Sequence, residues 1–223
     1  MRFIFVRHGH PNYELDCLTE LGHQHAEAAA LALQNEGISE IYASTCGRAY
    51  ETAQHTADKL NLPIVKCDFM REIRWAPKDG VELLKGGNPW FLAWDMIERG
   101  QSLLSPDWRQ IEPYCHSEVV DYEAAVSKAI DQWLLELGYE REGENYRVVG
   151  QNTQRTVAMF SHGGSSAAAL SHIANIPFPY FCASFPLDFT AITTFRLSDV
   201  PGALTAPRFE VLGDARHIQG LRP

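Results

Sequence analysis

Residues 2–9 read Arg-Phe-Ile-Phe-Val-Arg-His-Gly. The four apolar residues at 3–6 are followed directly by Arg7, His8 and Gly9. Such a short apolar run predicts a strand that is buried on both faces. Thr-Val-Ala-Met-Phe at 156–160 has the same character and leads into Ser161-His162-Gly163-Gly164. In an open parallel sheet, ligands bind beyond the carboxyl ends of the strands. We therefore expect His8 and His162 to meet at one edge of a sheet.

Strand patterns alternate with helix patterns along most of the chain. A helix is expected at 19–36, where Thr19 stands at the N-cap position and Gly37 follows the pattern. The other predicted elements are strands at 40–43, 63–67 and 191–197, an edge strand at 208–212, and helices at 47–60, 122–138 and 165–174. This alternation predicts an α/β fold of three layers, α/β/α, with a mostly parallel sheet and flanking helices.

The segment 74–121 departs from this alternation. It holds four of the five tryptophans, namely Trp75, Trp90, Trp94 and Trp108. We expect a helical insertion or cap at about 74–121, within one domain that spans 1–223. Core packing is the simpler expectation for most of these aromatic residues, and the alternative is that they wall a substrate pocket.

Composition narrows the class of protein. Lys and Arg number 19 against 28 Asp and Glu, so the net charge is −9, which argues against nucleic acid or anionic lipid as a partner. No apolar stretch is long enough to span a bilayer. Five widely spaced cysteines predict free thiols rather than disulfides or a zinc site, so we expect a cytoplasmic location. The sequence leaves open whether the protein forms a homodimer.

Charged side chains follow two further predicted strands. Arg48 comes after the strand at 40–43, and a guanidinium can hold a phosphoryl group through paired N–H donors. Glu72 comes after the strand at 63–67 and can lend a proton to a leaving oxygen if its pKa is raised. Gly163 lets helix N-terminal amides approach an anion closely. Together with Arg7 and His8 these residues indicate a phosphate site, although each of them alone can be structural.

Other polar residues are expected to have structural roles. His23 and His25 lie two positions apart on a predicted helix, so they face apart and are expected at the surface. Ser165 and Ser166 are expected to cap the helix at 165–174. Three arginines of the C-terminal tail, Arg208, Arg216 and Arg222, are expected to be solvated.

Four sequence motifs, taken in order, resemble those of the histidine phosphatase superfamily, which includes the phosphoglycerate mutases. Arg7-His8-Gly9 matches its RHG signature, and Ser161-His162-Gly163-Gly164 resembles its second histidine motif. Between them, Leu18-Thr19-Glu20-Leu21-Gly22 resembles a helix start of that family, and the stretch 41–53 resembles its "IYSSPLxRAxxTA" element. The combination is far more specific than a lone RHG.

The resemblance implies a role for each candidate residue. His8 would be the nucleophile that takes the phosphoryl group, and Arg7, Arg48, His162 and Gly163 would hold the phosphate. His162 would also take part in catalysis, and Glu72 would protonate the leaving alcohol and then activate water. Neither a metal nor a cofactor is implied. The expected activity is that of a histidine acid-type phosphatase, which hydrolyses a phosphate monoester of a small metabolite through a phosphohistidine.

The sequence departs from the family pattern at two places. His10-Pro11 follows the RHG motif, with Asn12 close by, and His10, Asn12 and Thr19 are candidate substrate contacts. The acid lies in Arg71-Glu72-Ile73-Arg74-Trp75 rather than in the extended motif of mutases, which favours a phosphatase. Two alternatives remain: a mutase that needs a bisphosphorylated cofactor to load His8, and a catalytically silent protein that binds a phosphorylated ligand.

Overall fold

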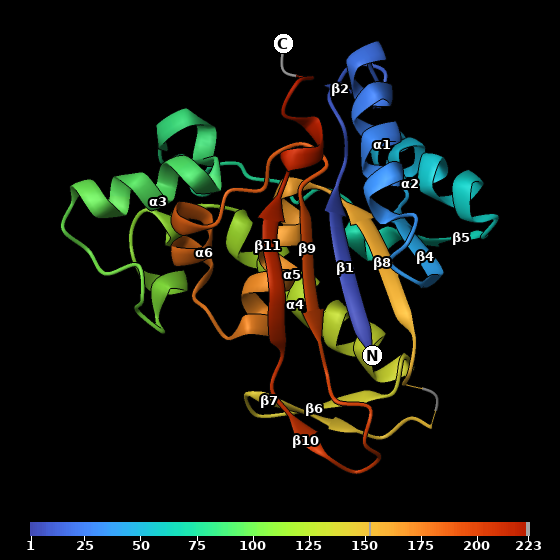
Figure 1. Ribbon diagram of the computed structural model, residues 1–223. Helices are drawn as coiled ribbons and strands as arrows, with labels where there is room; N and C mark the ends of the chain where they lie inside the picture. Colours follow the sequence, from blue (N-terminus) through green and yellow to red (C-terminus); the bar gives the residue numbers. More distant parts are fainter. Residues whose placement is uncertain (152, 222–223) are drawn as a thin grey trace.

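The computed structural model describes residues 1–151 and 153–221, and their elements form helical layers on both sides of a central sheet (Figure 1). The strands of this sheet run in the order β11, β9, β1, β8, β4 and β5. Their bounds are β1 (Arg2–Arg7), β4 (Ile38–Ser44), β5 (Ile64–Cys67), β8 (Thr156–Ser161), β9 (Ile192–Arg196) and β11 (Arg208–Asp214). This order places β1 beside β8 in the middle of the sheet.

The pairing is mostly parallel, as predicted. β1 pairs with β8, β8 with β4, and β4 with β5, all in parallel. β9 is antiparallel to β1, and β11 is antiparallel to β9. In the register of β1 and β8, Arg7 lies opposite Ser161, so His8 and His162 follow at the same edge. The backbone N–H of His8 donates to Ser161 O at 2.9 Å and fixes this juxtaposition.

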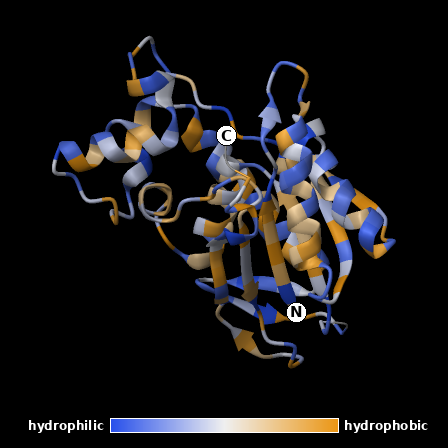
Figure 2. Cartoon of the chain, turned by 45° about the horizontal axis from the view of Figure 1, so that its top comes forward, coloured by the Kyte–Doolittle hydropathy of each residue, from blue (hydrophilic) through white to orange (hydrophobic). Residues whose placement is uncertain are grey.

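Both faces of the sheet are buried, which explains the unbroken apolar runs. Phe3 and Phe5 belong to one hydrophobic cluster and the alternate residues Ile4 and Val6 to the other. The first cluster includes residues of α4 (Val119–Glu136) and α5 (Gly163–Ala174), and the second includes residues of α1 (Glu20–Leu33) and α2 (Gly47–Leu60). Figure 2 shows hydrophobic residues concentrated along these central strands.

The helices begin where their local chemistry allows it. The Thr19 side chain accepts from Gly22 N at 3.1 Å and caps α1, as expected. α5 begins at Gly163, two residues before the predicted start, so both glycines of the histidine motif lie in its first turn. Ser165 Oγ accepts from His162 N at 3.3 Å, in keeping with a capping role.

Several short elements were not predicted. They are β2 (Pro11–Asn12), β3 (Cys17–Leu18), β6 (Tyr139–Glu142), β7 (Asn145–Val148), β10 (Leu204–Thr205) and α6 (Phe178–Ser184). β10, β7 and β6 form a separate small sheet below the amino ends of the central strands (Figure 1). These strands span at most four residues and contain few apolar residues, so their pattern is too short to recognise.

The segment 74–121 contains α3 (Pro89–Glu98), short 3-10 helices at Leu84–Gly87, Trp108–Gln110 and Tyr114–His116, and the start of α4. That the segment 74–121 is a cap inserted into one domain stays a prediction. Of the tail arginines, Arg208 is exposed and Arg216 pairs with Asp214 at 2.7 Å, whereas Arg222 lies outside the described residues. Among the helices of the described residues, none is long and apolar enough to cross a membrane.

Candidate active site

His8 is the first residue after β1, and its side chain is buried. Its Nδ1 lies 2.7 Å from Gly9 O, and since a carbonyl only accepts, Nδ1 carries the ring proton. The lone pair therefore sits on Nε2, which receives a hydrogen bond from Arg48 Nε at 3.3 Å. Burial, reinforced by the charge of Arg7, lowers the pKa of His8 to about 3. The ring is thus neutral at physiological pH, with its electron pair on Nε2 directed at the guanidinium group of Arg48.

His162 follows β8, and its ring centroid lies 5.1 Å from that of His8. Its Nε2 is 2.8 Å from the Oγ of Ser44 at the end of β4. Because Ser44 Oγ already accepts from Cys46 N at 3.2 Å, its proton is available to His162 Nε2. When Ser44 donates in this way, the ring proton lies on Nδ1, which is buried and has no hydrogen-bond partner within residues 1–151 and 153–221. Burial lowers the pKa of His162, and His8 adds to the effect.

Two guanidinium groups border His8. Arg7 donates from Nη1 to Leu187 O at 2.6 Å and lies 4.5 Å from the centre of the Phe189 ring. Its Nε is buried and has no acceptor among the described residues, so this donor is available to a bound anion. Arg48, in the first turn of α2, forms an ion pair with Asp16 and lies over the Tyr13 ring.

Glu72 lies at the start of α5, although it comes from the distant chain segment after β5. Its Oε1 accepts from Ile73 N and from Ser165 N, both at 3.1 Å. Burial raises the pKa of Glu72, and the nearby charge of Arg7 opposes this shift. A Cβ at Gly164 would lie 2.7 Å from Glu72 Oε1, so the second glycine of the motif makes room for the carboxyl group.

The first turn of α5 completes the site. A Cβ at Gly163 would lie 3.5 Å from Arg7 Nε, so the helix N-terminus directly adjoins the available guanidinium donor. The amides of such a first turn bind anions because they lack intrahelical acceptors and stand at the positive end of the helix dipole. The structure therefore brings together Arg7, His8, Arg48, Glu72, His162 and Gly163. Within the described residues, no group of three or more His, Cys, Asp or Glu side chains is arranged to hold a metal.

The three candidate substrate contacts lie in the loop after His8, and their side chains have local partners. His10 Nδ1 lies 2.9 Å from Thr19 Oγ1, and Thr19 also caps α1. Asn12 Oδ1 accepts from Glu14 N at 3.1 Å and from Leu15 N at 3.2 Å. A role of His10, Asn12 or Thr19 in binding substrate stays a prediction.

One prediction about a histidine was wrong. His25 is buried, with 1% of its surface exposed, and its Nε2 lies 2.7 Å from Leu221 O. The C-terminal segment and Phe189 cover it, and helix periodicity cannot reveal such a contact between distant parts of the chain. His23 is exposed, as expected.

Sequence reasoning missed several residues that support the site. Asp16 holds Arg48 and also accepts from Gly47 N at 2.8 Å, and Ser44 orients His162. Ser44 belongs to the stretch 41–53 that resembles a family motif, so the sequence does indicate that this residue lies near the site. Asp16 lies in a loop with a backbone φ of 50°, and nothing in its sequence neighbourhood indicated its partner.

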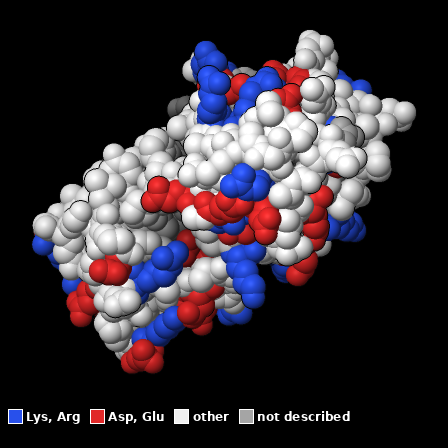
Figure 3. All heavy atoms as spheres, turned by 90° about the horizontal axis from the view of Figure 1, so that it is seen from below, with Lys and Arg blue, Asp and Glu red and all other residues white. Residues whose placement is uncertain are grey.

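A cavity of about 550 Å³ opens beside Arg7 and Glu72, and its aromatic lining residues are Tyr13, Trp75, Trp90 and Trp94. A larger cavity, about 780 Å³, lies at the amino ends of the strands, away from the histidines. There Arg2 and Arg196 both pair with Glu210. Acidic and basic side chains lie close together over parts of this underside (Figure 3).

Comparison with known proteins agrees with this geometry. Residues 3–104 match the family described as the histidine phosphatase superfamily (branch 1). No curated protein matches the chain. A solved phosphoserine phosphatase of Entamoeba histolytica, in complex with 3-phosphoglyceric acid, is 23% identical with a TM-score of 0.64, covering 97% of this chain and 98% of its own.

Two mycobacterial structures have the same fold. A protein described as mycobacterial hydrolase 1 is 22% identical with a TM-score of 0.64, over 96% of this chain and 98% of its own. A mycobacterial glucosyl-3-phosphoglycerate phosphatase with inorganic phosphate is 22% identical with a TM-score of 0.63, over 98% of this chain and 99% of its own. The predicted resemblance and the predicted α/β fold are therefore confirmed.

Proposed function

Residues 3–104 match the family model of the histidine phosphatase superfamily (branch 1), and on the premise of that similarity we propose that the chain hydrolyses phosphate monoesters of small metabolites through a phosphohistidine on His8. The observation that carries the proposal is the electron pair of His8 Nε2, which accepts from Arg48 Nε and lies near two buried nitrogens without partners among the described residues, Arg7 Nε and His162 Nδ1. We further propose that the protein acts in the cytoplasm.

The first half of the reaction follows from these positions. A phosphoryl group that contacts Arg7 Nε, His162 Nδ1–H and the Gly163 amide would present its phosphorus to His8 Nε2. The bond from Nε2 to phosphorus forms while the bond from phosphorus to the ester oxygen breaks. Glu72, whose pKa is raised by burial, is the acid that delivers a proton to the departing oxygen. Arg7 and Arg48 offset the negative charge of the transferring group.

In the second half, the Glu72 carboxylate takes a proton from water. The resulting oxygen attacks phosphorus and the bond from phosphorus to Nε2 breaks, which releases inorganic phosphate and restores neutral His8. The fixed Nδ1–H of His8, held by Gly9 O, keeps Nε2 aimed at phosphorus in both halves. The side chains described are sufficient for this scheme without a metal ion.

The test is the release of phosphate from 4-nitrophenyl phosphate by the wild type and by His8→Ala, without added metal. We expect turnover by the wild type that a chelator does not change, and no turnover by folded His8→Ala. His23→Ala is the matched control because His23 is exposed and outside the site. Turnover by His8→Ala at the wild-type rate would contradict the role of His8.

The same experiment separates a phosphatase from two alternatives, because neither of them releases inorganic phosphate at a comparable rate. A mutase would accept a phosphoryl group from a bisphosphorylated cofactor and pass it to a second substrate, with little release of inorganic phosphate. A silent protein would bind phosphate in the Arg7 and Gly163 cradle without labelling His8. The aligned Nε2 and the buried acid Glu72 favour a phosphatase, because a binding protein has no use for either.

A further inference from the structure

We call Arg7 Nε, His162 Nδ1 and the Gly163 amide the phosphate cradle. The cavity of about 550 Å³ beside it is lined by several aromatic side chains. Trp90 reaches the phosphate cradle, since a Cβ at Gly163 would lie 3.4 Å from its Cη2 atom. The ring of Trp75 stands perpendicular to that of Trp90, with centroids 6.3 Å apart. Trp94, one helical turn after Trp90 on α3, lines the same cavity. A leaving group attached to the bound phosphate would therefore meet the tryptophans first.

The charges in this cavity are arranged differently from those of the cradle. Among the described lining residues, Arg7 is the only cation, and it already serves Leu187 O and the phosphate cradle. Glu72 and Asp188 both bring acidic groups, and Asp188 lies close enough to interact electrostatically with Arg7. The amide oxygen of Asn88 accepts from Trp90 N at 3.2 Å. A carboxylate on the leaving group would thus find acidic neighbours and no cation of its own.

We infer that the substrate of this cavity is a phosphate monoester whose leaving group carries an uncharged, flat ring and no carboxylate. This inference rests on the proposed function, which supplies the phosphate position. Aromatic walls contribute favourable stacking and burial to a ring, whereas an unpaired carboxylate near acidic groups is disfavoured. 3-Phosphoglyceric acid and phosphoserine, with which the Entamoeba histolytica structures were determined, both carry a carboxylate. The two proteins would therefore differ in substrate.

The test compares three alkyl phosphate esters with similar leaving oxygens. They are 2-phenylethyl phosphate, ethyl phosphate and the phosphate ester of 3-hydroxypropionate (3-phosphopropionate). We expect kcat/KM to be highest for the phenylethyl ester and at least about tenfold lower for the carboxylate ester, since a single well-placed apolar group gives discrimination of that order. A carboxylate ester that is hydrolysed as fast as the phenylethyl ester would overturn the inference.

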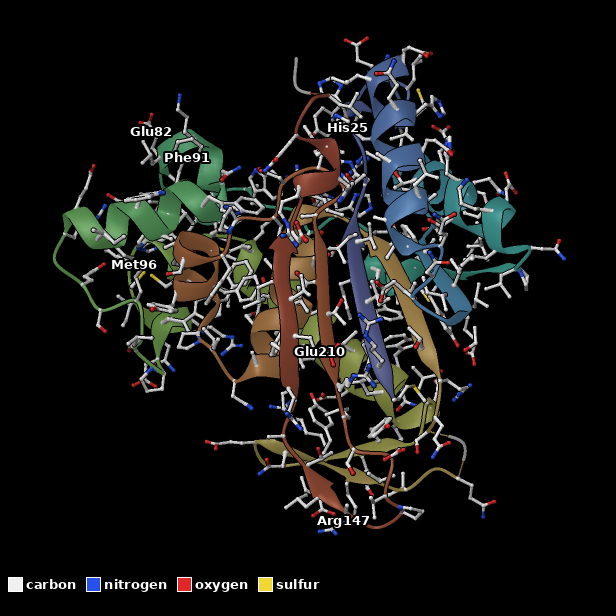
Figure 4. All side chains as sticks on the ribbon, viewed as in Figure 1. His25, Glu82, Phe91, Met96, Arg147 and Glu210 are labelled. Carbon is white, nitrogen blue, oxygen red and sulfur yellow. The ribbon has the colours of Figure 1, made fainter. Side chains whose placement is uncertain are left out.

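Three substitutions, one of them a control, locate the effect. Trp94→Leu should raise KM for the phenylethyl ester by a larger factor than KM for ethyl phosphate. Phe91→Leu is the matched control, because Phe91 is similarly exposed on the same helix (43% against 55% for Trp94) but does not line the cavity. Figure 4 shows Phe91 on the outer side of α3, near Glu82. Trp94→Arg should raise kcat/KM for 3-phosphopropionate by supplying the missing cation. Equal effects of the Trp94 and Phe91 substitutions would contradict the assignment.

Binding distinguishes failure of this inference from failure of the proposed function. The phosphonate analogues 2-phenylethylphosphonate and 3-phosphonopropionate cannot be hydrolysed, and calorimetric titration of His8→Ala measures their affinities without turnover. Tighter binding of the phenylethyl compound, combined with no hydrolysis of any ester by the wild type, would retain the inference and reject the phosphatase. Tighter binding of 3-phosphonopropionate would reject the inference whatever the turnover.

Discussion

His8 is buried as a neutral ring, so its protonation is linked to folding. Its pKa is about 3 in the folded chain against 6.5 when unfolded. Between these values only the unfolded chain binds the proton, so this residue makes the free energy of unfolding fall as the pH drops from 6.5. The slope for one proton is about 1.4 kcal/mol per pH unit. We expect His8→Asn to flatten the profile between pH 6 and 4 in urea titrations. Identical slopes for wild type and His8→Asn would contradict the neutral, buried ring.

Arg48 is held by two different contacts, and they are separable by substitution. Its Nε donates to His8, while its Nη1 forms the ion pair with Asp16. Lysine keeps the positive charge but lacks the paired N–H donors of a guanidinium. We therefore expect Arg48→Lys to lower kcat/KM by about 100-fold or more, while the free energy of unfolding changes by about 1 kcal/mol or less. Steady-state kinetics and urea unfolding of the same preparation give both numbers. A loss of stability as large as the loss of activity would assign Arg48 a purely structural role.

The loop 10–18 packs against the first residue of α2, Gly47. Asp16 accepts from Gly47 N, and a Cβ at Gly47 would lie 2.1 Å from Asp16 O. Gly47→Ala must therefore displace the loop that carries the partner of Arg48. We expect a destabilisation of roughly 1–3 kcal/mol together with reduced activity, because such a backbone clash cannot be relieved by a side-chain rotation. Gly220→Ala is the control, since a Cβ there meets no atom within 4 Å. Thermal unfolding and the phosphatase assay check both effects.

The elements that sequence reasoning located are those whose signal is local. The apolar runs of β1 and β8 and the cap at Thr19 depend on neighbouring residues, and so the positions of His8 and His162 could be predicted. The position of Glu72 is less evident from the sequence, because its partner, Ser165 N, belongs to a distant helix. Asp16 and the burial of His25 depend entirely on contacts between distant segments, which leave no periodic trace.

Across the whole molecule, the segment 74–121 shares one hydrophobic cluster with the main sheet. Trp108 and Tyr114 both contact Phe178 of α6, with centroids 5.6 and 6.2 Å apart, and all three belong to the cluster that contains Phe3. We expect Phe178→Ala to lower the free energy of unfolding of the entire chain by about 3–5 kcal/mol. Circular dichroism and tryptophan fluorescence should then give coincident urea transitions. A separate early fluorescence transition would show instead that the segment unfolds by itself.

The central place of β1 has a consequence for how the protein is made. Residues 2–7 pair with residues 156–161 and 192–196, so a ribosome releases the first strand long before either neighbour exists. Until then the apolar side chains of this strand lack their partners in the sheet, and exposed apolar surface of this kind is prone to aggregation. The pair of histidines assembles only when synthesis has passed β8 and His162. A polypeptide whose translation stops before that point would carry the RHG signature and yet have no phosphate site.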